Sequence, residues 1–207
     1  MRGIFITLEG ADGCGKTTQV GPLADALAAG GREVVRLREP GGTPISEKVR
    51  ALLLDPANAA MAAECELMLY EASRAQLVRE VIEPALARGA AVLCDRFYDS
   101  TYAYQAGGRG LPDELVRRAN ALGSCGLAPD RTLVLDLDPE LAYARATAGG
   151  ADRMEAEGLA FQRRVRDAYL RLAAEEPDRV RVIDASGEKD EVTARLLAAV
   201  ADLGTTR

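Results

Sequence analysis

The chain has 207 residues, of which 48% are hydrophobic and 28% charged, so it can bury the core of one domain and is not a disordered tail. Its net charge of −6 disfavours a nucleic-acid partner, and its uncharged apolar runs, at most about eight residues, are too short to cross a membrane. It has no histidine and four scattered cysteines, which disfavours a Ser-His-Asp hydrolase and a zinc protein and favours a cytoplasmic compartment where thiols stay reduced.

Strand and helix patterns alternate along the whole chain. In chain order, the patterns predict a strand over 2–9, a helix over 16–29, a strand over 33–38, helices over 45–54 and 62–87, strands over 90–94, 132–137 and 179–183, and a closing helix over 188–203. The first run has no basic leader, so no signal peptide is expected. Parallel strands need helical crossovers, so we expect one α/β domain over residues 1–207, with a five-stranded parallel sheet flanked by helices in three layers.

Residues 10–17 read Gly-Ala-Asp-Gly-Cys-Gly-Lys-Thr, which fits the P-loop pattern G-x-x-x-x-G-K-[ST] between the first strand and the first helix. The glycines let successive N–H groups turn toward an anion, and the helix N-terminus adds a positive dipole. Lys16 supplies a charge to the outer phosphates, and Thr17 offers a hydroxyl to Mg²⁺. The alternative is a chance match. The motif predicts a P-loop NTPase fold, with nucleotide phosphates bound by Gly10, Ala11, Asp12, Gly13, Cys14, Gly15, Lys16, Thr17 and Thr18.

The apolar strand over 90–94 ends in Asp95 and Arg96. An acidic residue at the end of a strand beside a P-loop is placed to hold Mg²⁺, directly or through water. Asp95 could instead cap a helix or form a local pair with Arg96. Together with Thr17, Asp95 is the candidate metal ligand.

Two helical faces indicate a pocket. Thr101, Tyr104, Gln105 and Gly108 share one face by helical spacing, and this face is polar and aromatic where a packing helix would be aliphatic. It is typical of a pocket wall for a planar, hydrogen-bonding ligand. Tyr70 and Arg74 share a face of the helix over 62–87. An aromatic residue there is usually core, but a buried arginine one turn later needs a partner.

Residues 95–105, Asp-Arg-Phe-Tyr-Asp-Ser-Thr-Tyr-Ala-Tyr-Gln, resemble the signature of the thymidylate (dTMP) kinase family, as do residues 38–43, 70–76, 135–140 and 152–155. The resemblance follows the family's order over nearly the whole chain. It implies that the γ-phosphate of Mg-ATP is transferred to dTMP, giving dTDP and ADP for dTTP synthesis, in a cytoplasmic homodimer. The alternative is a kinase for another nucleoside monophosphate or a deoxynucleoside. A regulatory GTPase is disfavoured, because neither Asn58 nor Asn120 is followed by lysine.

The resemblance also implies roles for single residues. Asp12 would accept a hydrogen bond from the 3′-hydroxyl of dTMP and lie near Mg²⁺, while Tyr70 would stack on thymine. Arg74 would hydrogen-bond the base, Thr101 and Gln105 would border it, and Tyr104 would crowd the 2′ position of the sugar. Arg96, with Arg38 or Glu39, would address the 5′-phosphate. The Glu39–Pro40 peptide bond is expected to be cis, and Cys14, which replaces a common alanine, is a candidate for oxidation.

The expected catalytic residues are Lys16, Asp12, Arg96 and Arg153. One branch of the family carries an arginine after the acidic P-loop residue, where this chain has Gly13, so another arginine must reach the γ-phosphate. We expect Arg153 to do so, from a lid over about 147–155, with Arg145 as the alternative. A purely structural interpretation pairs Arg153 with Asp152 or Glu155 at the surface.

Overall fold

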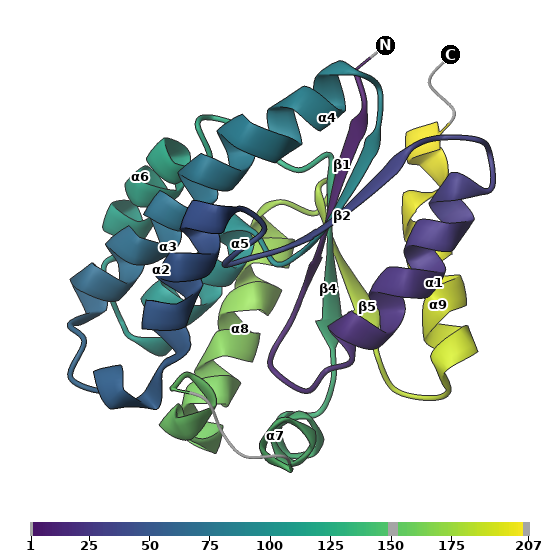
Figure 1. Ribbon diagram of the computed structural model, residues 1–207. Helices are drawn as coiled ribbons and strands as arrows, with labels where there is room; N and C mark the ends of the chain where they lie inside the picture. The colour runs from purple at the N-terminus through teal and green to yellow at the C-terminus, as the bar shows by residue number, and fades with distance from the viewer. Residues whose placement is uncertain (1, 149–152, 205–207) are drawn as a thin grey trace.

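The computed structural model describes residues 2–148 and 153–204 and contains one sheet of five parallel strands (Figure 1). The strands are β1 (Ile4–Glu9), β2 (Val34–Arg38), β3 (Ala91–Asp95), β4 (Arg131–Asp136) and β5 (Val180–Asp184). Their order across the sheet is β2-β3-β1-β4-β5, and every neighbouring pair is parallel. The predicted five-stranded parallel sheet is therefore confirmed.

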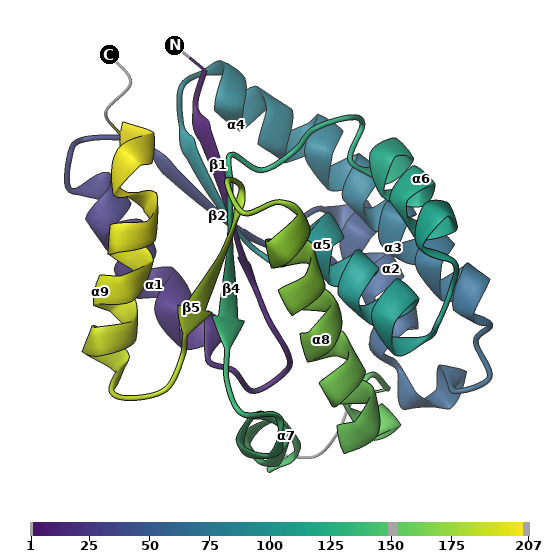
Figure 2. The ribbon, with the colours of Figure 1, turned by 180° about the vertical axis from the view of Figure 1, so that it is seen from behind.

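Helices cover both faces of this sheet, as Figures 1 and 2 show from opposite sides. One face carries α1 (Lys16–Ala28) and α9 (Lys189–Val200). The other carries α2 (Pro44–Leu54), α3 (Ala63–Leu77), α4 (Glu83–Ala87), α5 (Tyr98–Thr101), α6 (Asp113–Gly123) and α8 (Leu159–Glu175). Helix α7 (Pro139–Thr147) lies beyond the carboxyl end of β4, next to the loop that follows β1. No described helix is long and apolar enough to span a bilayer.

The central strand β1 is held firmly in the sheet, because its side chains are buried on both faces. Ile6 and Leu8 pack in one apolar cluster with α1 and α9, while Phe5 packs in another with α3 and α4. Alternation along a strand sends neighbouring side chains to opposite faces, so a strand buried on both faces is mostly apolar, as β1 is apart from Thr7 and Glu9. The loop after β1 is thus held by a strand that is buried along nearly its whole length.

Two predicted helices contain π-helical turns. The helix predicted over 62–87 is α3, the π-helix η2 (Val78–Ile82) and α4, and Pro84 lies in the first turn of α4. Proline has no N–H to donate, so the regular ladder cannot run through it. A second π-helix, η3 (Tyr102–Gly108), follows α5 and packs against α8. Such turns are rare and occur often at functional sites.

Candidate active site

The P-loop between β1 and α1 is built around glycines. Gly10, Gly13 and Gly15 have φ values of 133°, 79° and 100°, which residues with side chains rarely adopt. At Gly13 a Cβ atom would also lie 2.0 Å from the backbone oxygen of Ala142 in α7. The loop therefore packs directly on α7 and leaves no room for a side chain at this position.

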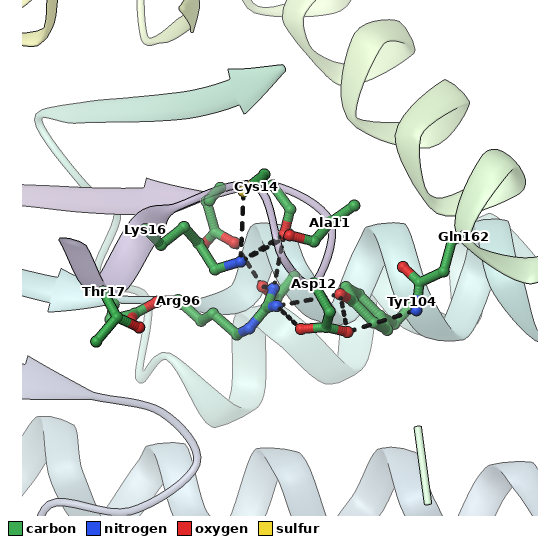
Figure 3. A network of polar contacts seen from close by, with 12 residues as sticks. Ala11, Asp12, Cys14, Lys16, Thr17, Arg96, Tyr104 and Gln162 are labelled. Carbon is green, nitrogen blue, oxygen red and sulfur yellow. Dashed lines mark hydrogen bonds and ion pairs between the residues drawn. The ribbon is translucent and has the colours of Figure 1, made fainter. Parts of the chain in front are cut away.

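Lys16 is folded back into the loop that precedes it, as Figure 3 shows. Its ammonium group donates to the backbone oxygens of Gly10 at 3.0 Å and Ala11 at 2.9 Å, and Sγ of Cys14 lies 3.6 Å away. The side chain of Cys14 is buried within the core beneath the loop, which limits the access of an oxidant to its thiol. The charge of Lys16 is thus held inside the turn by two carbonyl dipoles.

Thr17 and Asp95 meet beside the P-loop. The Thr17 hydroxyl lies 3.4 Å from a carboxylate oxygen of Asp95, which ends β3 next to β1. Among the described residues no group of three or more histidine, cysteine or acidic side chains could enclose a metal. Mg²⁺ in a kinase site is usually held by one or two protein oxygens together with the phosphates, so these two residues fit it.

Arg96 connects the P-loop to the π-helix η3. Its guanidinium forms an ion pair with Asp12 and donates to the Tyr104 hydroxyl at 3.1 Å, and Tyr104 donates to Asp12 at 2.7 Å (Figure 3). Gln162 of α8 approaches the same carboxylate at 3.5 Å. Burial by itself would raise the pKa of Asp12, but the charges of Arg96 and Lys16 outweigh it and lower that pKa. Asp12 is therefore ionised between two cations.

A pocket opens directly beside this group. It is lined by eight residues that the sequence analysis singled out, namely Asp12, Glu39, Tyr70, Arg74, Arg96, Thr101, Tyr104 and Gln105. The pocket is also lined by six residues for which no binding role was predicted, Pro40, Arg50, Leu54, Phe97, Ser100 and Met154. Two of the residues that were expected at the pocket lie elsewhere. Arg38 donates to the Pro40 oxygen and to Glu47, and Gly108 packs against the ring of Phe161, where a Cβ atom would lie 2.5 Å from ring carbons.

Arg74 has the partners that its burial requires. It is 1% exposed, forms ion pairs with Glu39 at 2.8 Å and Glu71 at 2.5 Å, and donates to the Thr101 hydroxyl at 2.9 Å. Burial raises the pKa of Glu39 to about 8. The positive charge of Arg74 acts against this increase, while Glu71, which pairs with the same guanidinium, adds to it. The Glu39–Pro40 bond is cis, as predicted, and one carboxylate oxygen of Glu39 has no hydrogen-bond partner among the described residues.

Arg153 lies against α2 and α3. It is 5% exposed, pairs with the buried Glu66 at 2.5 Å and donates to the Leu53 oxygen at 2.7 Å. The alternative interpretation of a surface pair does not fit this guanidinium, because it is almost fully covered, and Asp152, one of the two partners considered, lies outside the described residues. Residues 149–152 of the expected lid lie outside the described residues. Arg145, the alternative, is exposed on α7.

Two buried carboxylates, Glu9 and Glu66, were not among the residues predicted from the sequence. Glu9 is fully buried at the end of β1, directly before the P-loop, and Glu66 is fully buried on α3. An acidic residue that ends an apolar strand was the signal that singled out Asp95, and the same signal was present at Glu9. No pattern singled out Glu66, whose partners Arg109 and Arg153 come from distant parts of the chain.

The fold and the site define the class of this protein. A P-loop at the carboxyl end of the central strand faces a polar and aromatic pocket that shares Asp12 with it, and an acidic strand end lies beside both. This arrangement brings a nucleotide triphosphate and a second small molecule together, as a P-loop kinase of small substrates requires.

Comparison with known proteins gives the family. The thymidylate kinase family model matches residues 8–196. The chain is 51% identical over 204 residues to a thymidylate kinase of Deinococcus radiodurans, covering 98% of both chains, and 48% identical over 204 residues to that of Trichlorobacter lovleyi, covering 95% of this chain and 96% of the relative. It superposes on a crystal structure of thymidylate kinase from Ehrlichia chaffeensis with a TM-score of 0.80 at 33% identity, covering 97% of this chain and 100% of that one. The chain belongs to the thymidylate kinase family.

Proposed function

We propose that this chain transfers the γ-phosphate of ATP to the 5′-phosphate of dTMP, giving dTDP and ADP for dTTP synthesis. The observation that carries this proposal is the pocket beside the P-loop. Its lining includes Tyr70, Thr101 and Gln105 together with Asp12 of the P-loop itself. A planar base held among the first three would bring the other end of the nucleotide to the loop that holds the donor phosphates.

On the donor side, the residues from Gly10 to Thr18 would hold the phosphates of ATP through backbone N–H groups and the start of α1. Lys16 would exchange its two carbonyl partners for phosphate oxygens. Thr17 and Asp95 would hold Mg²⁺, which when bound neutralises charge on the phosphates. The protein's own part is to hold the donor in line with the acceptor and to keep water out.

On the acceptor side, Tyr70 would stack on thymine, Thr101 and Gln105 would border the base, and Arg74 would donate to it. Three N–H groups of Arg74 are already used within the protein, so the base would take those that remain. Tyr104 would crowd the 2′ position and Asp12 would accept from the 3′-hydroxyl. Arg96 would bind the 5′-phosphate next to Glu39. Arg38 would contribute indirectly, because it donates a hydrogen bond to the backbone oxygen of Pro40.

Phosphoryl transfer needs cations near the migrating group, because the charge of the transition state spreads over its oxygens. Lys16 and Arg96 already lie at the P-loop. A further arginine would come from the segment after α7. Arg153 would have to break its ion pair with Glu66 to reach the γ-phosphate. Arg145 is exposed on α7 and has no such partner among the described residues.

We also propose a cytoplasmic homodimer. Helix α3 packs against both α2 and α6, and all three helices expose large apolar side chains. These are Ile45 and Leu52 on α2, Leu115 and Leu122 on α6, and Met68 on α3, and the helical repeat places each pair on one side of its helix. An apolar face across three neighbouring helices is uncommon on a monomer, and a second copy of the same face would cover it by two-fold symmetry.

The test is ADP release from Mg-ATP in the presence of dTMP, dUMP, UMP, CMP, AMP or GMP in turn. We expect kcat/KM to be highest for dTMP. A Lys16→Ala variant measured in parallel excludes a contaminating kinase, because it should lose ADP release with every acceptor. A higher kcat/KM for another monophosphate would contradict the proposed substrate.

A further inference from the structure

A carboxylate lies directly beneath the phosphate site and has no assigned task. Glu9, the last residue of β1, is 0% exposed, and the residues before it in the strand are apolar except for Thr7. It accepts hydrogen bonds from the backbone N–H of Phe97 at 2.7 Å, from the Ser100 hydroxyl, and from the Tyr169 hydroxyl at 2.9 Å. A buried charge with three donors is costly to bring in and is kept only where those donors satisfy it.

The same two hydroxyls also contact Arg96. One nitrogen of its guanidinium donates to Ser100 Oγ at 3.0 Å, to Tyr169 Oη at 3.4 Å and to the Gly10 oxygen at 3.0 Å. The other terminal nitrogen faces Asp12 and Tyr104 at the pocket. Ser100 and Tyr169 therefore form a layer between Glu9 and Arg96.

The direction of the hydrogen bonds in this layer follows from the chemistry of its ends. Burial, with the nearby Asp99, raises the pKa of Glu9 to about 7, so above that pH Glu9 is ionised and only accepts, while a guanidinium only donates. Neither hydroxyl can then turn its proton toward Arg96: each donates to Glu9 or to the other hydroxyl, which lies 2.8 Å away, and its lone pairs face Arg96. If the side chain at position 9 donated a hydrogen bond instead, a hydroxyl proton of Ser100 or Tyr169 could point at Arg96 and would repel its guanidinium.

Glu9 also holds the backbone at this point. Arg96 has a φ of 72°, a left-handed conformation that is unfavourable for a residue with a side chain. The next N–H along the chain, that of Phe97, is the one bound by Glu9, and the N–H of Arg96 is bound by the Leu8 oxygen. The end of β1 thus fixes both the turn and the side-chain layer that aim Arg96.

We propose that Glu9 is a positioning residue for the reaction: through Ser100 and Tyr169 it orients Arg96 toward the 5′-phosphate of the acceptor nucleotide. This inference rests on the proposed function, in which Arg96 binds that phosphate. Glu9 itself touches no substrate, because it is fully buried behind the layer. Its effect is therefore specific to the phosphate end of the acceptor and absent at the base.

The experiment compares wild type with Glu9→Gln, which keeps the volume and the bond to Phe97 but brings a donor into the layer. Binding of dTMP and of thymidine, which lacks the phosphate, is measured by titration calorimetry or competition. We expect the Kd for dTMP to rise about tenfold or more, and the Kd for thymidine and the KM for ATP to stay within about twofold. Thr7→Val, in the same buried strand, is the matched control and should change neither Kd.

An equal loss of dTMP and thymidine binding, or unchanged dTMP binding, would overturn the inference. Tyr169→Phe removes one hydroxyl of the layer and keeps the ring, so the inference stays testable if Glu9→Gln does not fold. It should weaken dTMP but not thymidine binding, and the absence of that difference would also overturn the inference. The double variant should lose less than the two single losses combined. A wild type that binds dTMP no better than thymidine would overturn the phosphate role of Arg96, and with it this inference.

Discussion

The Arg153 guanidinium and the Glu66 carboxylate form a buried ion pair at 2.5 Å that connects the segment after α7 to the first turn of α3. Glu66 also accepts from Gln105 at 2.8 Å and pairs with Arg109 at 3.0 Å. The Glu66 carboxylate thus connects three parts of the molecule: Arg153, the π-helix η3 beside the pocket, and α3, which belongs to the exposed apolar face. We therefore expect a substitution at one of these places to alter the hydrogen bonds that Glu66 makes with the others.

Replacing Arg153 should reduce stability. Arg153→Ala leaves Glu66 with Arg109 but removes a buried partner, and breaking such a pair costs about 3 kcal/mol in unfolding free energy. Urea denaturation of the variant and the wild type measures this loss. A difference below about 0.5 kcal/mol would show that the pair is not maintained in solution.

Catalysis gives a separate test of Arg153. If it leaves Glu66 to reach the γ-phosphate, Arg153→Ala should reduce kcat by about 10³-fold with dTMP binding nearly intact. Arg145→Ala is the matched variant, because it removes the exposed arginine of α7 instead. A kcat within about threefold of wild type for Arg153→Ala, with a large loss for Arg145→Ala, would transfer the role to Arg145.

Selection of the sugar is expected to depend on the ring of Tyr104. This ring lines the pocket and its hydroxyl donates to Asp12. Tyr104→Ala should narrow the ratio of kcat/KM between dTMP and its ribose counterpart, because space opens at the 2′ position. Tyr104→Phe keeps the ring and should leave that ratio nearly unchanged. Equal ratios in wild type and Tyr104→Ala would remove the steric role.

Tyr70 should contribute to binding of the base. It is half-buried and lines the pocket, as a stacking residue must and a core residue does not. Tyr70→Ala should raise the KM for dTMP by a stacking loss of about 1–3 kcal/mol, whereas Tyr70→Phe should bind nearly as well as wild type. An unchanged KM in a folded Tyr70→Ala variant would assign this side chain to the core.

Stability should depend on pH through Glu39. Its pKa is raised from an ordinary value near 4.5 to about 8, so the native state binds its proton more tightly than the unfolded state. The free energy of unfolding should therefore fall as pH rises from about 4.5 to 8, by up to about 1.4 kcal/mol per pH unit from this group. Glu39→Gln has no such group and should lack this part of the slope. Equal slopes in both proteins would contradict the raised pKa.

The apolar face should form the dimer. Met68→Lys places a charge in its centre, on the exposed side of α3, and should produce a monomer in analytical ultracentrifugation. Leu141→Lys, exposed on α7 outside this face, is the control and should leave the oligomeric state unchanged. A monomeric wild type would contradict the proposal.

Much of the fold could be predicted from local patterns. The predicted bounds of the strands lie within two residues of those observed, because strand periodicity and glycine-rich ends are local signals. The π-helices could not be predicted. The widened turn of η3 depends on its packing against α8, where Gly107 and Gly108 allow close approach. Helical spacing still placed Thr101, Tyr104 and Gln105 on one side, since the widening begins just after Thr101.

The site was predictable where motifs carry it and not where it depends on distant contacts. The residues of the P-loop and of the run from Asp95 to Gln105 came from recognisable patterns. The partner of Arg153 did not, because Glu66 lies on a helix whose exposed and buried faces are both partly polar. The burial of Glu66 could be recognised only from the tertiary structure, which brings Arg109 and Arg153 to it.

The most direct test of the central claim is product formation from dTMP and Mg-ATP, followed by chromatography of all four nucleotides. We predict that wild type forms dTDP and ADP in equal amounts, that dTMP is used faster than any other monophosphate, and that Lys16→Ala forms neither product. ADP formed without dTDP, or a faster reaction with a different monophosphate, would contradict the assignment of this chain as a dTMP kinase.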